Sequence, residues 1–325
     1  MKNKIKKKVL IIGSNFGRNH YKILNKYYNF DIYIFSPNIL KKKLNFKQAT
    51  LLNSTDFFVN NKYFHTIVCC TNPENQKKLI YKIIKKKVYC KYLMLEKPIT
   101  DNLHLIKKLT SFCLSNKVNM GVNFTYNQLK ISKILSRHLL SPEFKKVFFN
   151  LSFHHHYLIK KNSSWKNFIR LGGGIVNYYL IHIIFLFVNI FPKLKINTIK
   201  PIIKNKQLAG LNINFKHKKK IILEIDTKLD TKNIIHKYKI IKLNEIVEIY
   251  TKKNNWYKNY FIKIEKKQKT KISKTTDNLD NTIKLNYERL FKYKTIDQKN
   301  YYNLIYSSQK ICNDINKNIK IYDFK

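Results

Sequence analysis

The sequence VLIIGSNFGRNH, from Val9 to His20, combines an apolar run with two glycines. It begins as a continuous apolar run, which is typical of a strand buried on both faces, and ends around Gly13 and Gly17 with no glycine between them. A dinucleotide loop uses glycines for a tight turn, for close approach to the pyrophosphate, and for close packing of helix on strand. If Gly17 is the packing glycine, Ser14 lies at the close-approach position and Ile12 at the turn. Alternatively, the loop is one residue shorter and Gly13 makes the turn.

Either way, the N-terminus of the following helix, from Phe16 onward, offers N–H groups to an anion. Taken alone, the stretch is equally compatible with an ordinary strand-to-helix turn of a doubly wound sheet.

Strands and helices alternate through the first 125 residues. Strands are expected at 9–12, 31–35, 66–70, 88–95 and 118–124, and helices at 18–28, 74–86 and 103–115. Alternation of this kind predicts βαβ units and a parallel sheet.

The pattern changes after residue 125. Helices are expected at 127–140, 172–191, 282–291 and 298–316, strands at 146–155, 195–199, 211–215, 220–226, 234–243 and 246–250, and a solvated hairpin or loop at 252–274. Runs of strands with few helical signals between them predict a mostly antiparallel sheet. We therefore expect two domains, 1–122 and 123–325. Packing of the closing helices, 282–316, back onto the first domain is an option that the sequence leaves open.

The formal net charge of +47 suggests a nucleic-acid or membrane-surface partner. The charge pattern argues against it, because only four of the 65 basic residues are arginines and the lysines are spread over the whole chain. Asn and Ile are as inflated as Lys, and all three have A/T-rich codons. We therefore favour a genome-wide base bias and expect no specific nucleic-acid partner, with a polyanion partner as the alternative.

The five cysteines form no CxxC pair, and their odd number fits reduced, structural thiols in a cytoplasm. The N-terminal apolar run is too short for a signal segment. The longest apolar run, 178–191, is shorter than the ~20 residues that span a bilayer. We expect a cytoplasmic protein without a membrane span.

Five motifs then follow one another in a fixed order. They are VLIIGSNFGRNH (9–20), TNPENQ (71–76), LEKP (95–98), VNFTY (122–126) and GGGIVNYYLIH (172–182). This series resembles the Gfo/Idh/MocA oxidoreductase family, over about the first 190 residues. The resemblance implies an N-terminal Rossmann domain, a doubly wound parallel sheet, followed by a C-terminal α+β domain with a mostly antiparallel sheet. It also implies an NAD(P)-dependent dehydrogenase or reductase and a homo-oligomer assembled through the C-terminal sheet.

The resemblance places the cofactor at the carboxyl ends of the first strands. The residues expected to bind it are Gly13, Ser14, Asn15, Phe16, Gly17, Ser36, Thr71, Asn72, Pro73, Glu96 and Lys97. NAD-binding proteins usually place an acid at the end of the second strand, to hold the ribose 2′-hydroxyl. Here that position is Ser36, with Lys41 to Lys43 nearby, so NADP is favoured over NAD.

Lys97 is the main catalytic candidate, because in the family this lysine lies near the nicotinamide ring and the reacting hydroxyl. An ammonium there can orient the alcohol and assist proton movement. Glu96 is expected to pair with Lys97 or with the cofactor ribose. The resemblance also implies that the Lys97–Pro98 bond is cis.

His182 lies eight residues after Gly174, as the family's catalytic histidine does; a core histidine is the alternative. Tyr178 stands where the family often has an aspartate, one helical turn before the histidine. A tyrosine cannot stabilise an imidazolium as a carboxylate does, but it can donate a proton or bind substrate. Tyr126 and Arg170 are further candidates for substrate contact, with a core or interface tyrosine and a surface arginine as the alternatives.

His154, His155 and His156 invite a metal interpretation. On a strand, successive side chains point to opposite faces, so the three cannot share one ion, and we expect no metal site.

The resemblance implies a sugar, sugar nucleotide or related polyol as substrate. Gln76, where many relatives have histidine, is similar to members linked to surface-polysaccharide synthesis. Two alternatives stay open: a cofactor-binding regulatory or inactive homologue, motivated by the missing aspartate, and an imine reductase of the same family.

Overall fold

The computed structural model describes residues 6–36, 46–52, 63–86, 88–153, 165–204, 207–229, 235–252, 258–267, 269–292 and 295–319. The chain divides into two compact units. Unit 1 comprises residues 1–124 and 283–306, and unit 2 comprises residues 125–282 and 307–325. The predicted division into independently folding domains at residue 122 stays a prediction.

Unit 1 is built on a six-stranded parallel sheet with the strand order β3-β2-β1-β4-β5-β6. Its strands are β1 (Lys7–Ile12), β2 (Phe30–Phe35), β3 (Thr50–Leu52), β4 (Tyr63–Cys69), β5 (Tyr89–Leu95) and β6 (Asn119–Val122). This is the doubly wound Rossmann order, in which the direction of winding reverses between β1 and β4. Ligands of such sheets bind outside the carboxyl ends of the strands at this switch point.

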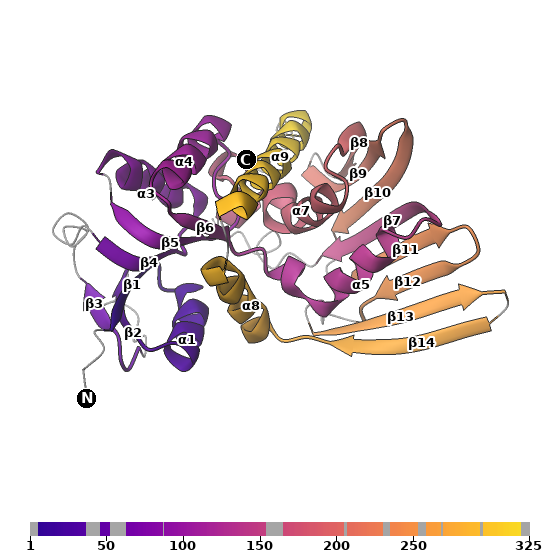
Figure 1. The fold of residues 1–325 in the computed structure, drawn as a ribbon. Helices are drawn as coiled ribbons and strands as arrows, with labels where there is room; N and C mark the ends of the chain where they lie inside the picture. Colours follow the sequence, from indigo (N-terminus) through magenta and orange to yellow (C-terminus); the bar gives the residue numbers. More distant parts are fainter. Residues whose placement is uncertain are drawn as a thin grey trace. The chain divides into compact units, whose positions relative to one another are not determined.

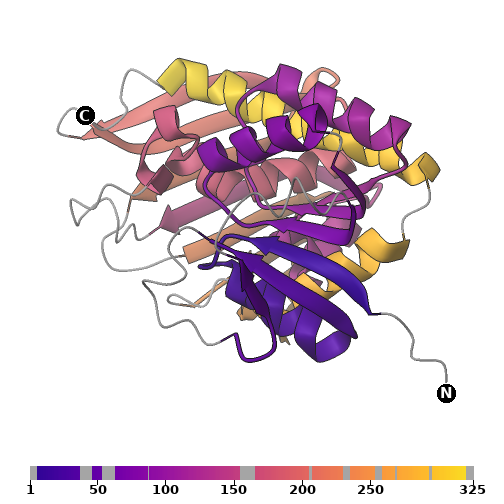
Figure 2. The same ribbon diagram turned by 90° about the vertical axis from the view of Figure 1, so that its left-hand side faces the viewer.

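Helices cover both faces of this sheet. Helix α1 (Gly17–Tyr27) lies on one face, and α3 (Pro73–Lys85) and α4 (Leu103–Ser115) lie on the other (Figures 1 and 2). Because both faces are covered, β1 is buried along Val9–Ile12, as its unbroken apolar run predicts.

Unit 2 contains an eight-stranded sheet with the order β14-β13-β12-β11-β7-β10-β9-β8. Its strands are β7 (Phe144–Phe153), β8 (Lys195–Lys204), β9 (Gln207–His217), β10 (Lys220–Leu229), β11 (Ile235–Lys242), β12 (Ile246–Tyr250), β13 (Asn259–Lys266) and β14 (Lys269–Thr276). All neighbouring pairs are antiparallel except β7 with β10. The predicted fold class, a Rossmann sheet and a mostly antiparallel second sheet, is confirmed.

The helices of unit 2 are α5 (Lys130–Leu139) and α7 (Ile181–Ile190), which is buried from Ile181 to Val188. Helices α8 (Leu279–Lys292) and α9 (Thr295–Ile319) each contribute residues to both units. In the described part of the chain, no helix is long and apolar enough to cross a membrane.

Three elements differ from the sequence-based expectation. Strand β3 was not predicted, because three residues carry too little pattern to detect. The helix expected at 127–140 begins only at Lys130, because Leu129 has an extended backbone (φ −64°, ψ 145°) after a 3₁₀ turn. The helix expected at 172–191 is interrupted by a π-helical turn at Val176–Leu180.

Candidate functional site

Gly13 makes the turn that ends β1. Its φ is +103°, and a Cβ at this position would lie 2.5 Å from the carbonyl oxygen of Cys70 on the adjoining strand end. Its N–H donates to the carbonyl of Phe35 (2.8 Å), which keeps the turn in register with β2. The backbone therefore follows the shorter of the two loops considered from the sequence, with Gly13 at the turn.

Gly17 lets α1 pack closely on β1. A Cβ there would lie 3.1 Å from Cγ2 of Ile11. The N-cap residue, Phe16, makes no side-chain cap, and the first turn of α1 contains no acidic residue. The start of α1 thus presents a positive helix end whose N-cap side chain makes no capping bond, which suits an anion.

Ser14 and Ser36 lie together at the ends of β1 and β2. Both are buried, and their Oγ atoms are 3.0 Å apart, within hydrogen-bond distance. Neither hydroxyl carries a charge, and Ser36 stands where NAD-binding proteins usually place an acid. Pro37, Asn38 and Lys41 to Lys43 lie outside the described residues.

The segment after β4 turns directly into α3. Asn72 caps the helix by accepting from the N–H of Asn75 (2.8 Å), and Pro73 occupies the first helical turn. Thr71 and Asn72 are half-buried, and they follow the carboxyl end of β4, next to the switch point.

Gln76 holds the segment that carries Lys97. Its fully buried amide donates from Nε2 to the carbonyls of Glu96 (2.9 Å), Pro98 (3.0 Å) and Ile99 (3.0 Å), and its Oε1 accepts from the N–H of Glu96 (3.2 Å). Lys97 is half-buried, and the Lys97–Pro98 bond is cis, as the resemblance implied. Sequence reasoning noted Gln76 only as a difference from relatives, although glutamine can offer both the donor and the acceptor that this strand end needs.

Glu96 is the centre of a buried polar network. Its Oε1 accepts from Nε2 of His20 (2.9 Å) and from Nδ2 of Asn123 (2.7 Å). Nδ1 of His20 lies 2.6 Å from the hydroxyl of Tyr287, and Asn286 donates to Oδ1 of Asn123 (2.8 Å). We call these five residues the strand-end network.

The side chain of Glu96 accepts from His20 and Asn123, and its expected pairing with Lys97 or with the cofactor ribose stays a prediction. The sequence did not predict His20 as a partner of Glu96. The place of this histidine three residues after Gly17, on the buried side of α1, is the signal that could have identified it.

In unit 2, the three consecutive glycines allow the segment at 165–169 to lie against the chain that enters α7. Gly172 and Gly174 have φ of +79° and +77°. A Cβ on Gly173 would lie 2.1 Å from the carbonyl oxygen of Trp165, and one on Gly174 would lie 2.7 Å from Cγ1 of Ile169. The glycines are therefore explained by backbone shape and packing.

The predicted catalytic residues of unit 2 follow this turn. Tyr178 is half-buried in the π-helical turn, with its ring near Trp165 and 5.0 Å from Nζ of Lys166. His182 is 7% exposed near the start of α7, in a wholly apolar stretch. Arg170 is exposed, with its guanidinium 5.2 Å from the ring of Phe168. π-Helical turns are frequent at functional sites, which keeps Tyr178 of interest.

Tyr126 is a core residue of unit 2. It is 1% exposed, and its hydroxyl lies 2.5 Å from that of Tyr238. Tyr260 and His236 complete a buried group that we call the tyrosine cluster, with the Tyr260 hydroxyl 3.5 Å from Nδ1 of His236. Burial raises the pKa of the three phenols and lowers the pKa of His236 to about 3. The cluster is neutral around pH 7, and its burial favours the core alternative for Tyr126 over substrate contact.

Unit 1 gathers its predicted residues at one edge. Ile12 is in register with Phe35 and Cys69, and Cys69 with Leu95. The loops that follow these residues therefore start side by side at the carboxyl edge of the sheet. The residues brought to this edge are Gly13, Ser14, Asn15, Phe16, Gly17, Ser36, Thr71, Asn72, Pro73, Glu96 and Lys97. Tyr126, Arg170, Tyr178 and His182 belong to unit 2, and His154 to His156 lie outside the described residues.

No known protein family and no curated protein matches the sequence. Solved structures do match over nearly the whole chain. KijD10, a 3-ketoreductase from Actinomadura kijaniata crystallised with NADP and TDP-benzene, is 10% identical with a TM-score of 0.74, over 94% of this chain and 97% of that one. An oxidoreductase from Agrobacterium radiobacter crystallised with NAD⁺, L-tartaric acid and magnesium is 14% identical with a TM-score of 0.73, over 96% and 97%.

A third similar structure is that of the transcriptional regulator Gal80p from Kluyveromyces lactis, 12% identical with a TM-score of 0.72, over 96% of this chain and 92% of that one. At 10 to 14% identity these likenesses establish the fold. The chain shares with all three proteins an architecture in which a Rossmann-type parallel sheet is joined to a second, mostly antiparallel sheet.

Proposed function

We propose that this protein is an NAD(P)-dependent oxidoreductase of the Gfo/Idh/MocA type. It transfers hydride to or from a carbon that bears the hydroxyl or carbonyl oxygen of a sugar, sugar nucleotide or related polyol. The observation that carries the proposal is the edge of unit 1 at the switch point. There the Gly13 turn and the uncapped start of α1 adjoin the strand end that presents Lys97.

The residues at this edge fit a dinucleotide. The start of α1 suits a pyrophosphate, because its N-cap side chain leaves the first N–H groups to a ligand. The Ser14–Ser36 pair suits an adenosine ribose with or without a 2′-phosphate, and the lack of a carboxylate there supports NADP over NAD. When bound, the nicotinamide supplies or accepts the hydride.

Lys97 would hold the substrate oxygen. Its ammonium donates to a hydroxyl or carbonyl and stabilises negative charge that develops there. Gln76 supports this role by fixing the backbone on both sides of the lysine through its contacts with Glu96, Pro98 and Ile99. A side chain on a fixed backbone loses less entropy when it binds.

His182 and Tyr178 are the candidates for proton transfer, and Arg170 is the candidate for an anionic group of the substrate. For these three residues the proposal rests on the sequence resemblance, because they belong to unit 2 whereas the edge proposed to bind the dinucleotide belongs to unit 1. Tyr126 is given no part in the reaction, since its hydroxyl is buried against Tyr238.

Two observations support the proposed substrate class and cellular compartment. A similar structure contains a TDP derivative, which supports a sugar-nucleotide-like substrate. The five cysteines are free thiols, which supports a reducing compartment such as the cytoplasm. From the resemblance we also expect a homo-oligomer formed through the sheet of unit 2.

A regulatory protein without turnover is the second candidate. It is favoured by Tyr178 at the place of the family aspartate, and by the similarity to Gal80p, a transcriptional regulator. Such a protein would bind NADPH or NADH but oxidise or reduce no substrate.

The test begins with binding and turnover. NADPH and NADH binding is measured by calorimetry, and cofactor oxidation and reduction are screened against nucleotide sugars, polyols and imines. We then expect Lys97→Met to lower turnover roughly 10²–10⁴-fold and to leave cofactor binding intact. Lys108→Met, at an exposed lysine of α4, is the matched control and should behave as wild type.

The outcomes separate the candidates. Turnover by Lys97→Met at the wild-type rate would refute the role of the lysine. Binding of NADPH without turnover on any substrate class would favour the regulator, and absence of binding would refute both.

Cofactor preference has its own variant. Ser36→Asp places a carboxylate at the end of β2, so we expect NADPH binding to weaken about tenfold, or about 1.4 kcal/mol, while NADH binding is retained. An unchanged ratio of the two affinities would place the ribose elsewhere.

A further inference from the structure

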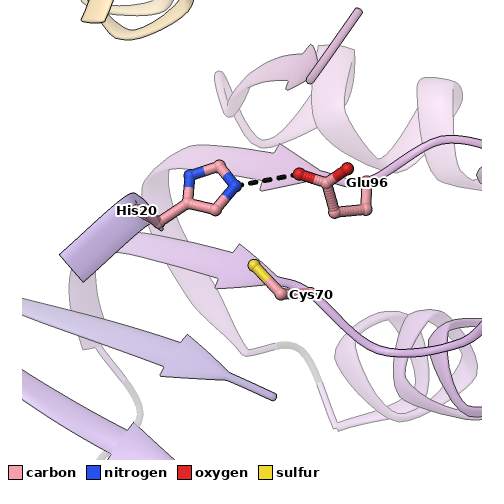
Figure 3. Close-up of side chains that lie close together, drawn as sticks. All are labelled: His20, Cys70 and Glu96. Atoms are coloured by element: carbon pink, nitrogen blue, oxygen red, sulfur yellow. Dashed lines mark hydrogen bonds and ion pairs between the residues drawn. The ribbon is translucent and has the colours of Figure 1, made fainter. Parts of the chain in front are cut away.

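Three side chains with different metal-binding atoms meet at the carboxyl edge of the unit 1 sheet. His20 lies in the first turn of α1, Cys70 directly follows β4, and Glu96 directly follows β5. Their ligand atoms all lie within 4.8 Å of one another (Figure 3). Among the residues that the structure describes, this is the one group of three or more His, Cys, Asp or Glu side chains with that property.

The sheet register explains why they meet. Cys69 is paired with Leu95, so Cys70 and Glu96 leave neighbouring strands at the same level. Cys69 is also paired with Ile12, the last residue of β1, and the short loop after β1 places α1 above these two strand ends. Figure 3 shows the thiol of Cys70 pointing toward the gap between the His20 ring and the Glu96 carboxylate.

The donor set has the chemistry of a zinc ligand sphere. Zinc takes imidazole nitrogen, thiolate sulfur and carboxylate oxygen at about 2.0–2.3 Å in a tetrahedron. Ligand atoms of such a site are about 3–4 Å apart, so a cluster already within 4.8 Å needs shifts of only about 1 Å. A thiolate and a carboxylate together balance the charge of the dication, and a fourth position remains for water.

The contacts behind the cluster suit a metal-binding histidine. A ligating imidazole usually uses its other nitrogen to hold a fixed partner, and Nδ1 of His20 lies 2.6 Å from the Tyr287 hydroxyl. A hydroxyl both donates and accepts, so the ring can turn its Nε2 lone pair to an ion without losing this bond. Asn123 orients Glu96 in the same way, through Oε1, and leaves Oε2 for coordination.

We propose that Zn²⁺ binds to His20 Nε2, Cys70 Sγ and the carboxylate of Glu96, with water as the fourth ligand. On binding, the S–H bond of Cys70 breaks, its proton leaves to solvent, and the sulfur lone pair forms the bond to the metal. The hydrogen bond between His20 and Glu96 is exchanged for coordination of both groups. The N–H bond at Nε2 of His20 breaks and its proton leaves to solvent, while Nδ1 takes up a proton and donates a hydrogen bond to the Tyr287 hydroxyl. The neutral ring then offers its Nε2 lone pair to the metal. The site uses Glu96, which lies at the same edge of unit 1 as Lys97, but its test by metal binding does not depend on the proposed oxidoreductase activity, and it adds a metal site that the sequence did not predict.

Cobalt provides the test. The full chain, treated with chelator and kept reduced with a phosphine, is titrated with Co²⁺ and followed by absorption. We expect one equivalent to bind, with a near-ultraviolet thiolate-to-cobalt band and tetrahedral d–d bands, and both should be displaced by Zn²⁺. Cys70→Ser should remove the thiolate band, and His20→Gln or Glu96→Gln should weaken binding at least tenfold.

Matched controls use the same residue types elsewhere in unit 1. Cys113→Ser, in α4, and His104→Gln, at an exposed position, should keep the wild-type spectrum. Absence of the thiolate band in the wild type, or its survival in Cys70→Ser, would overturn the proposal.

Folding of the variants is checked by circular dichroism. X-ray absorption of the zinc-loaded wild type gives an answer that needs no variant. One sulfur and three nitrogen or oxygen neighbours are expected, and a shell without sulfur would refute the site.

Discussion

The strand-end network of unit 1 and the tyrosine cluster of unit 2 are both buried polar groups, yet they are built differently. The first contains a carboxylate, an imidazole, two amides and one phenol, joined by bonds of 2.6 to 2.9 Å. The second contains three phenols and an imidazole that burial keeps neutral. The charged carboxylate of the first group lies where parallel strands end, whereas the neutral tyrosine cluster lies in the core of unit 2.

The difference reflects the backbone around each group. Parallel strands end at one edge and leave carbonyl and N–H groups that side chains must satisfy. Gln76 forms hydrogen bonds with such groups after β5. In the antiparallel sheet of unit 2 the ladder satisfies the backbone, so the tyrosine hydroxyls pair with one another and with His236. We therefore expect changes at the strand ends of unit 1 to affect both folding and ligand binding, and changes in the tyrosine cluster to affect folding alone.

The largest effect is expected from Gly13→Ala. The left-handed backbone strains any other residue, and the new Cβ would lie 2.5 Å from the carbonyl of Cys70, so we expect a loss of at least ~3 kcal/mol in the free energy of unfolding. Urea unfolding followed by circular dichroism measures it. Gly121→Ala is the control, because its Cβ would meet only side-chain atoms, at 3.2 Å or more. Equal losses in the two variants would show that the Gly13 turn is not the constraint we infer.

A smaller loss should follow Gln76→Ala. It leaves the N–H of Glu96 and three carbonyls without their side-chain partner, which should cost about 2–4 kcal/mol of unfolding free energy. Asn75→Ala, at an exposed position in the same helix, should cost little. Gln76→His, which keeps a donor, should fall between them. If Gln76→Ala unfolds at the wild-type urea concentration, the strand end does not depend on this amide.

The tyrosine cluster is tested by pH. The pKa of His236 is lowered to about 3 in the folded chain, against an ordinary value of 6.5, so the unfolded chain binds more protons between these values. Stability is therefore complete above about pH 6.5 and is lost as the pH falls, by about 1.4 kcal/mol per pH unit for this group. Burial also lowers the pKa of His65 and of His138, which adds to the same trend.

The variant His236→Gln isolates the contribution of this histidine to the pH dependence of stability. We expect the variant to lose less stability than the wild type between pH 7 and pH 5, with cofactor binding unchanged at pH 7. His104→Gln, at an exposed histidine, should leave the slope as it is. An identical slope in His236→Gln would mean that the ring is solvated and that the cluster is not a closed core.

Much of unit 1 could be predicted from local sequence. Apolar strands and helical periods alternate along the first 125 residues, with a glycine turn after the first strand, and each depends on residues that are close in the chain. The same local patterns gave β7 to β12 of unit 2, but for β13 and β14 they indicated only a solvated hairpin or loop. They missed β3 in unit 1 and the π-helical turn before His182 in unit 2. Those elements depend on pairing and packing with distant segments, which periodicity does not record.

The candidate site divides in the same way. Consecutive residues were enough to place Lys97 at a strand end, to identify the proline that follows it and to limit the turn after the first strand to two loops, of which the structure shows the one with Gly13 at the turn. Only the tertiary structure decided that His20, Cys70 and Glu96 would meet, and that Asn286 and Tyr287 of α8 would support them. The physical reason is that a strand register fixes which loop ends become neighbours, and no local pattern of side chains contains that register.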